Sequence, residues 1–180
     1  MTGARDGASG VVHLRREREL ASAHWLLSAA PDIGRSRAEW QDRGSTWLRP
    51  GFLFGAVAVR AALVHAALGL DDPVACRLPL AEHLAGPVFY SPEGFAGAGA
   101  YTVMVSASTA MAWRSIGSEP HDRRALLLVP GPDLIEPQEN RPWWVVPFDG
   151  PGLLCRARPL TALISAGRRA AGRRGGDDGA

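Results

Sequence analysis

Histidine, aspartate, serine and cysteine are the residues of this chain that could carry acid–base, metal or nucleophilic chemistry. All twenty Lys+Arg positions are arginine, because the sequence contains no lysine. The absence of lysine excludes a Gly-Lys-Ser/Thr phosphate loop, a Schiff-base lysine and a lysine base. Any chemistry must therefore come from other side chains, and their spacing decides what they could do.

The spacing of these residues matches no catalytic or metal-binding motif. The five histidines include no His-Glu-x-x-His pair, and none stands at zinc-ligand spacing from a cysteine. The serines at 106–118 lie outside any Gly-x-Ser-x-Gly elbow. Asp71 and Asp72 could offer carboxylates to Mg²⁺, but Asp-Asp-Pro after a glycine is typical of a turn. The sequence predicts no metal site, no cofactor and no catalytic residue.

One glycine-rich stretch, GFAGAGA at 94–100, could bind phosphate. A dinucleotide fingerprint places its glycines between a strand and the N-terminus of a helix. Here the glycines lead into a stretch that begins at Tyr101 and whose pattern predicts a strand. The sequence therefore favours a flexible hairpin loop over a phosphate site.

Tryptophan and arginine residues are the candidates for a binding surface. Trp143 and Trp144 are adjacent on a predicted strand, whose period sends their rings to opposite faces. We therefore expect one of the two to be partly exposed, beside Arg141. Arg168 and Arg169 end the last predicted helix, where they either complement its dipole or attract nucleic acid or an acidic partner. Three other tryptophans are expected in the core: Trp25, Trp40 and Trp47.

A second hypothesis is a small enzyme or ligand-binding protein with a pocket near the loops 91–100 and 130–142. Loops of this length on a compact scaffold often carry function. His121, Asp133 and Asp149 would line such a pocket. A third hypothesis is a protein-interaction or immunity-type module that docks through an exposed aromatic patch. A homodimer of this kind would build its interface on Trp144 or its neighbour.

The elements that would position these residues follow from hydrophobic periodicity. Helices are predicted over 14–29, 36–44, 60–68, 80–85, 108–113 and 159–171, and strands over 46–49, 52–59, 88–90, 101–106, 125–129 and 143–148. Ser36 is expected to cap the second helix, with Glu39 completing a capping box. The order of elements predicts an α+β (mixed α/β) fold in a single compact domain, with a mixed sheet flanked by helices. We expect this domain to span 13–171, between a flexible N-terminus at 1–12 and a disordered Arg/Gly/Asp tail at 172–180.

The charge distribution bears on the partner. The formal net charge is +2, and residues 20–165 hold 12 arginines against 13 acidic residues. The excess positive charge therefore lies toward the two ends of the chain. A nucleic-acid groove usually has a basic face, so the overall charge gives only weak support for one.

Cysteine usage and hydropathy bear on the compartment. Cys76 and Cys155 are far apart in the sequence and are typical of reduced thiols in a cytoplasmic protein. The first ten residues contain no apolar signal segment. The apolar stretch 52–70 has Arg60 near its centre, which favours a buried strand and helix over a membrane span. We therefore expect a cytoplasmic protein with no membrane partner.

Several short motifs occur in an order that resembles a known family. They are HWLLSAAP (24–31), WLRPGFLFGAVAVRAAL (47–63), GPVFYSP (86–92), YTVMVSASTAMAWR (101–114), LLLVPGPD (126–133) and WWVVPFDGPG (143–152). This order resembles small proteins of GC-rich bacteria described as bifunctional DNA primase/polymerase, N-terminal-like, and the resemblance covers residues 20–170. It implies an α/β domain of the primase–polymerase fold, whose active members hold two metal ions for nucleotidyl transfer.

The chain departs from that family's active-site pattern. Active members carry two aspartates on one strand, a later Ser-x-His and a third acid. The corresponding strand here, 52–59, has no acid, and Gly55 stands where small relatives tend to have aspartate. The Ser-x-His at Ser22-Ala23-His24 precedes that strand instead of following it. The leading hypothesis is therefore a non-catalytic primase/polymerase-like domain that binds nucleic acid or a protein partner.

Overall fold

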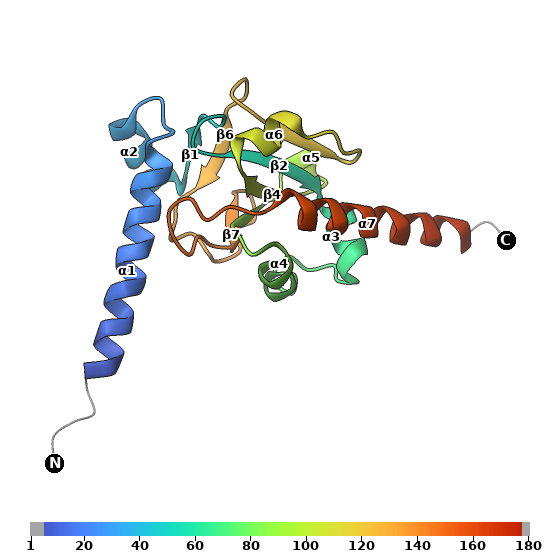
Figure 1. Cartoon of the computed structure of the whole chain (residues 1–180), viewed down its shortest axis with the longest axis horizontal. Coiled ribbons are helices and arrows are strands. Elements are labelled where there is room, and N and C mark those ends of the chain that lie inside the picture. The colour runs from blue at the N-terminus through green and yellow to red at the C-terminus, as the bar shows by residue number, and fades with distance from the viewer. Residues whose placement is uncertain (1–5, 178–180) are drawn as a thin grey trace, which may run out of the picture.

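The chain folds into helices and antiparallel strands in alternation (Figure 1). The computed structural model describes residues 6–177, and of these the side chains of residues 16–173. The helices are α1 (Asp6–Leu27), α2 (Ile33–Arg43), α3 (Ala61–Leu68), α4 (Arg77–Leu84), α5 (Gly94–Gly97), α6 (Ala107–Ala112) and α7 (Ala157–Asp177). The strands are β1 (Ser45–Leu48), β2 (Gly55–Arg60), β3 (Val88–Ser91), β4 (Ala100–Val105), β5 (Ser118–His121), β6 (Leu127–Pro130) and β7 (Trp143–Val146). The predicted α+β class is confirmed.

The strands form a five-stranded sheet in the order β5-β2-β4-β3-β7 and a two-stranded ribbon of β1 and β6. Every pairing between these strands is antiparallel, whereas a mixed sheet was expected. The reason is the position of β4. The crossover from β2 through α3 and α4 leads to β3, but β4 lies between β2 and β3 and pairs antiparallel with both.

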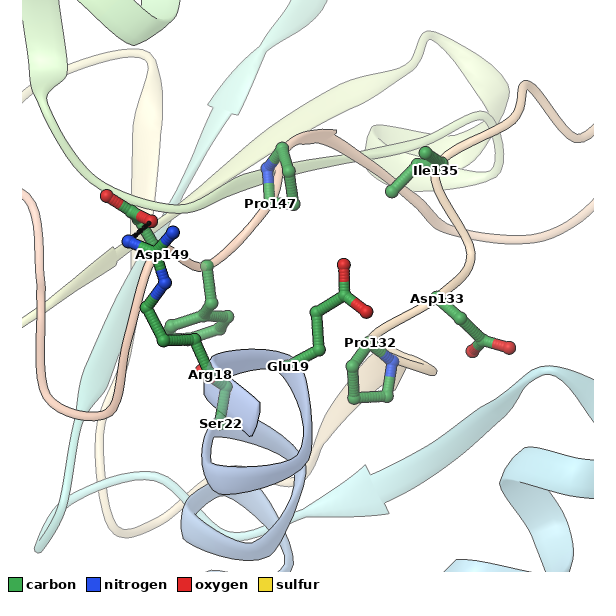
Figure 2. Close-up of a pocket in the computed structure, with 9 residues that line it drawn as sticks. Arg18, Glu19, Ser22, Pro132, Asp133, Ile135, Pro147 and Asp149 are labelled. Atoms are coloured by element: carbon green, nitrogen blue, oxygen red, sulfur yellow. Dashed lines mark ion pairs between the residues drawn. The ribbon is translucent and has the colours of Figure 1, made fainter. Parts of the chain in front are cut away.

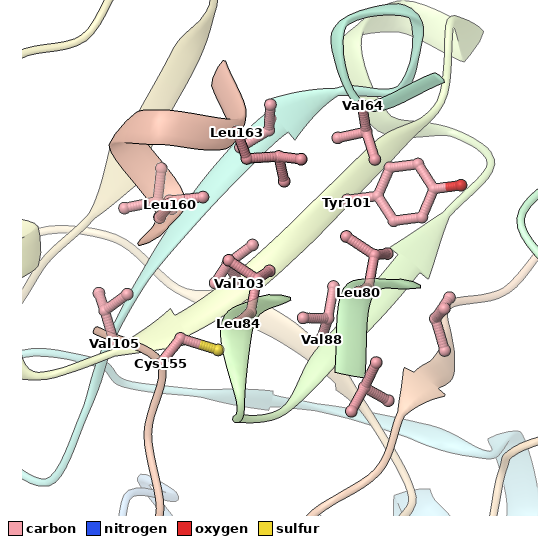
Figure 3. Packing of buried hydrophobic residues seen from close by; sticks show 14 of the residues in the cluster. Val64, Leu80, Leu84, Val88, Tyr101, Val103, Val105, Cys155, Leu160 and Leu163 are labelled. Carbon is pink, nitrogen blue, oxygen red and sulfur yellow. The ribbon is translucent and has the colours of Figure 1, made fainter. Parts of the chain in front are cut away.

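The first core fills the space between one face of the five-stranded sheet and α3, α4 and α7 (Figure 3). Alternate residues of the central strands point into it, including Val57, Val59, Tyr101, Val103 and Val105. The helices contribute Val64, Leu80, Leu84, Leu160 and Leu163, all buried. Complete burial of one such aliphatic side chain contributes about 1.5–3 kcal/mol.

The second core lies on the other face of the sheet, beneath the β1–β6 ribbon and the end of α1. Trp143 belongs to the first core and Trp144 to the second, so the predicted alternation of their rings is correct. The expectation that one of them is partly exposed is wrong, since they are 2% and 0% exposed. An exposed ring requires an uncovered sheet face, and here both faces are covered.

Helices α3 and α7 approach each other unusually closely. A Cβ atom added to Gly167 of α7 would lie 2.1 Å from the carbonyl oxygen of Leu63 in α3. Glycine at this position therefore sets the distance between the two helices. Beyond the contact, α7 extends away from the sheets, as α1 does on the other side of the molecule (Figure 1).

The predicted starts of α2 and β2 each differ from the structure by three residues. Helix α2 begins after Asp32, whose Oδ1 accepts a hydrogen bond from the backbone N–H of Arg35 at 3.0 Å, while Ser36 is buried. Asp32, a strong N-cap residue, precedes Ser36 and so starts the helix earlier. Strand β2 begins at Gly55 and not at the predicted Phe52. Phe52 lies in the turn before the strand, where it is 82% exposed.

The ends of the chain are more helical than expected. Helix α1 includes residues 6–12, which were assigned to a flexible segment, and α7 includes residues 172–177 of the predicted tail. The remaining terminal residues, 1–5 and 178–180, lie outside the described residues, and the domain boundaries stay a prediction. No helix within the described range is both long and apolar enough to cross a membrane.

Candidate functional site

The outer face of the β1–β6 ribbon carries an exposed tryptophan, and we call this surface the Trp47 face. The backbone alternation of β1 turns Thr46 and Leu48 into the protein and Trp47 outward, where it is 51% exposed. The expectation that Trp47 contributes to the core is therefore wrong. The exposure of Trp47 could have been inferred from the sequence. Arg49 stands two residues later and so belongs to the same face of the strand.

Four arginines border the Trp47 face. Arg49 follows β1, while Arg123 and Arg124 lie in the turn before β6. The backbone of Arg123 lies next to Gly51. The fourth, Arg60, places its guanidinium 4.5 Å from the centroid of the Phe95 ring. All four are exposed, and within residues 16–173 none of them forms an ion pair.

A cavity of about 190 Å³ opens beside Trp47, and we call it the ring pocket. Its lining includes the small residues Ala58, Gly94 and Ala100 and the aromatic residues Trp47, Phe89 and Phe95. The apolar residues of the segment 126–128 also line it. A mostly apolar lining with several rings suits a flat, partly apolar group.

Polar groups reach the ring pocket from β5. This edge strand was not predicted, because Ser-Glu-Pro-His has no strand pattern and pairs with β2 only in the folded chain. It places Glu119 and His121 in the lining. The Nδ1 atom of His121 is buried and has no hydrogen-bond partner among the described residues. Burial lowers the pKa of His121, so the imidazole is neutral near pH 7.

The loop that closes the ring pocket has a strained backbone. Phe95 and Ala96 have φ values of 49° and 59°, a left-handed conformation that costs about 1–2 kcal/mol per residue for side chains with a Cβ. Where a hairpin loop was expected, residues 94–97 form the short element α5, which is left-handed at Phe95 and Ala96. Such strain is concentrated at ligand-binding sites in proteins.

The other predicted binding residues do not form one surface. Arg141 is exposed, and its Nη1 donates a hydrogen bond to the carbonyl of Arg43 at the end of α2. Arg168 and Arg169 are exposed on α7, which covers the opposite face of the sheet from the ribbon. A homodimer interface built on Trp144 is excluded by the burial of that ring.

The residues predicted for an alternative pocket separate into two sites. His121 lines the ring pocket together with Ser91, Gly94 and Phe95 of the 91–100 loop. Asp133 and Asp149 line a different cavity, next to α1 (Figure 2). The loops 91–100 and 130–142 therefore serve different cavities.

Position 55, where the resemblance implies an aspartate, has no room for one. A Cβ atom at Gly55 would lie 2.3 Å from the Cβ of Ala110, because α6 packs directly on β2 there. The buried strand β2 consequently brings no carboxylate into a cleft. Asp72, by contrast, accepts a hydrogen bond from the backbone of Ala75, which is the turn chemistry predicted for it.

Neither a metal-binding cluster nor a similar known protein identifies the function of this site. Among the residues that the structure describes, no three His, Cys, Asp or Glu side chains are grouped so as to hold a metal ion. Comparisons with protein-family profiles, curated proteins and solved structures found no match to this chain. The geometry of the Trp47 face is therefore the main indication of function.

Proposed function

We propose that this protein is a non-catalytic, primase/polymerase-like binding domain and that it binds single-stranded nucleic acid through the Trp47 face. One observation carries the proposal: a half-exposed indole stands on a paired ribbon, bordered by arginines that form no ion pair with any other residue of the described range. Stacking of a base on an aromatic side chain contributes about 1–3 kcal/mol and tolerates any sequence. A single strand offers the faces of its bases, which a duplex keeps stacked on one another.

The arginines of the Trp47 face suit the phosphates of the same strand. Guanidinium groups bind phosphate through two parallel hydrogen bonds, and arginine is the basic residue used throughout this chain. Arg49 and Arg124 flank the ribbon, and Arg60 lies beyond the ring pocket, over Phe95. A strand crossing the face would stack on Trp47 while its phosphates meet these arginines.

The non-catalytic part of the proposal rests on Gly55. An acid at this position would displace α6, so the strand that carries the metal-binding acids in active primase–polymerases has no equivalent function here. A cytoplasmic location belongs to the same proposal. It is supported by Cys76 and Cys155, which are both unpaired and buried.

Fluorescence anisotropy with a labelled twelve-nucleotide DNA at low salt tests the proposal. We expect binding with a Kd of about 10 µM or tighter. Replacing the indole in Trp47→Ala should weaken binding about tenfold, the lower half of the range for one stacked base. The matched control is Met111→Ala, which removes a similarly exposed apolar side chain from α6 on the opposite face of the sheet and should leave the Kd unchanged.

Two outcomes would overturn the proposal. Equal affinities of the Trp47→Ala and Met111→Ala variants would remove Trp47 from the interface. Equally tight binding of an acidic peptide of the same charge would show that the face recognises a protein partner.

A second candidate function, a small-ligand pocket, is favoured by the buried Nδ1 atom of His121, for which the described part of the chain offers no hydrogen-bond partner. A single nucleoside or another planar heterocycle would fit the ring pocket and give that nitrogen a partner. Titration with adenosine and cytidine alone separates the two functions. Saturable binding of a nucleoside with no gain for the oligonucleotide would favour the small-ligand protein.

A further inference from the structure

A groove of about 510 Å³ lies between the start of α2 and the β1–β6 ribbon, and we call it the α2 groove. Helix α2 ends directly before β1, and the helix packs beside the ribbon (Figure 1). The four arginines that border the Trp47 face do not line the groove. The lining includes Pro31, Arg35, Trp47 and Leu126. The groove is therefore a separate space next to the same indole.

Trp47 stands between the α2 groove and the ring pocket. Trp47 and Leu126 line both cavities, and among the described residues the two linings have no other member in common. These two side chains are 51% and 49% exposed, and they form the ridge that separates the cavities. An indole with open space on both sides can contact two flat groups at once.

The charged groups of the α2 groove are already matched within the protein. Glu39 accepts a hydrogen bond from the Nε of Arg35 at 2.9 Å and another from the Thr46 hydroxyl at 2.6 Å. Asp32 caps α2, where its Oδ1 accepts a hydrogen bond from the backbone N–H of Arg35. The lining therefore favours an uncharged occupant over a phosphate or an ammonium group.

A nucleobase combines the properties that this lining favours. Pro31 and Leu126 offer apolar contacts next to the indole, which suit a flat ring. The Arg35 side chain is 77% exposed and uses its Nε–H on Glu39, so its other N–H groups remain able to donate to the polar edge of a base. Successive bases of a single strand commonly stack on aromatic side chains while basic residues follow the backbone. The neighbour of a base in the ring pocket is therefore the occupant that fits the groove.

We propose that Trp47 stands between two successive bases of a bound single strand, one in the ring pocket and the next in the α2 groove. This inference rests on the function proposed for the Trp47 face and adds a second base site to it. The two uncharged bases occupy the two cavities, while the phosphates of the strand stay with the arginines that border the face.

Competition against the labelled twelve-nucleotide DNA, with the full chain, tests how many neighbouring bases are held. Three unlabelled twelve-residue strands have the same phosphates and differ in their bases. One carries a single thymine among abasic residues, one carries two adjacent thymines, and one carries two thymines separated by five abasic residues. We expect the adjacent pair to bind about tenfold more tightly than the single thymine, and the separated pair only about twofold more tightly.

Arg35→Ala and Arg37→Ala separate contact in the groove from loss of charge. Both variants remove one exposed arginine from α2, but only Arg35 lines the groove. Arg35→Ala should weaken binding of the adjacent pair about threefold, equivalent to losing one hydrogen bond to a base. Arg37→Ala should leave it unchanged.

Phe95→Gly tests the other base site. The Phe95 ring lines the ring pocket and not the α2 groove. Glycine adopts the φ of 49° at this position readily, so the variant removes the ring without straining the turn. The affinity for the adjacent pair should then fall toward that for the single thymine.

Three outcomes would overturn the inference. Equal affinities for the adjacent pair and the single thymine, both weakened by Trp47→Ala, would remove the second base site and leave nucleic-acid binding at the Trp47 face intact. Equal effects of Arg35→Ala and Arg37→Ala would remove the base from the α2 groove. Displacement of the adjacent-pair DNA by an uncharged leucine-containing peptide would assign the groove to a protein partner. By contrast, Trp47→Ala without effect on any of the three strands would contradict the proposed function itself.

Discussion

Two histidines on opposite faces of the five-stranded sheet are kept neutral by their surroundings. His65 of α3 lies within 2.9 Å of the Tyr101 hydroxyl, and the two rings meet edge-on. Burial lowers the pKa of His65 and raises that of Tyr101, so the pair is uncharged near pH 7. His121 borders the ring pocket, and burial likewise lowers its pKa. Protonation of either imidazole therefore opposes folding.

The stability of the chain should fall as the pH is lowered from 7.5 to 5.5. The pKa of His121 lies below its unfolded value of 6.5, so the unfolded chain takes up protons first. The contribution of neutral His121 to the free energy of unfolding is fully present above pH 6.5. It is lost as the pH falls toward the lower pKa of the folded state. We expect His121→Gln to lose less stability over this interval than the natural sequence, measured by urea unfolding at both pH values.

The matched control is His24→Gln, which changes an exposed histidine of α1. It should lose as much stability on acidification as the natural sequence. A pH dependence that is unchanged in His121→Gln would show that the burial of His121 does not affect folding.

The residues of the candidate site were only partly predictable from the sequence. His121 was one of three residues expected to line a pocket near the loops 91–100 and 130–142, and it lines the ring pocket. Trp47 was placed in the core and Trp143 or Trp144 at the surface, and both assignments are wrong. Strand alternation gives the face of a side chain, but whether that face is covered depends on how distant segments pack.

At the scale of elements, the crossing of α3 and α7 depends on glycine, which has no side chain, at position 167. Gly167 allows the backbone of α7 to rest against the carbonyl of Leu63. The side chains beside it, Leu163 and Ile164, complete the first core. The position of α7 over the sheet is therefore fixed by a backbone contact.

Gly167→Ala should destabilise the protein by about 2 kcal/mol, because its methyl group would overlap the Leu63 carbonyl and force the helices apart. Gly172→Ala in the same helix is the control, since a Cβ there meets nothing within 4 Å. It should stabilise the helix by about 0.5–1 kcal/mol through propensity alone. Urea unfolding measures both variants, and equal effects would contradict the close packing at Gly167.

Most long elements could be predicted from the sequence, whereas the short and strained ones could not. The apolar runs at β4 and β7 predict these two strands from the local sequence alone. The stop signals around α3 predict the bounds of that helix in the same way. β5 contains Pro120 and forms because β2 offers it an edge. The 94–97 turn is left-handed at two residues other than glycine, a conformation imposed by the rest of the fold.

At the scale of the whole molecule, the fold separates two surfaces that could carry positive charge. The Trp47 face lies over the second core, and the arginines of α7 lie beyond the first. The net charge of +2 is too small for strong long-range attraction of nucleic acid. Binding must then depend on contacts made by the few arginines at one face.

The salt dependence of DNA binding measures how many arginines take part. Each phosphate neutralised on a single strand contributes about 0.7 to the slope of log K against log salt. Engagement of Arg49, Arg60, Arg123 and Arg124 therefore predicts a slope of about −3 at most. In Arg49→Ala and in Arg124→Ala, the slope should become shallower by about 0.7.

Arg168→Ala provides the matched control, since it removes an exposed arginine from α7. Its slope should equal that of the natural sequence if the strand lies on the Trp47 face. A slope of about −5 that becomes shallower in Arg168→Ala would place the end of α7 in contact with the phosphates. The bound strand would then have to pass from one side of the molecule to the other, and the Trp47 face alone would not be the binding surface.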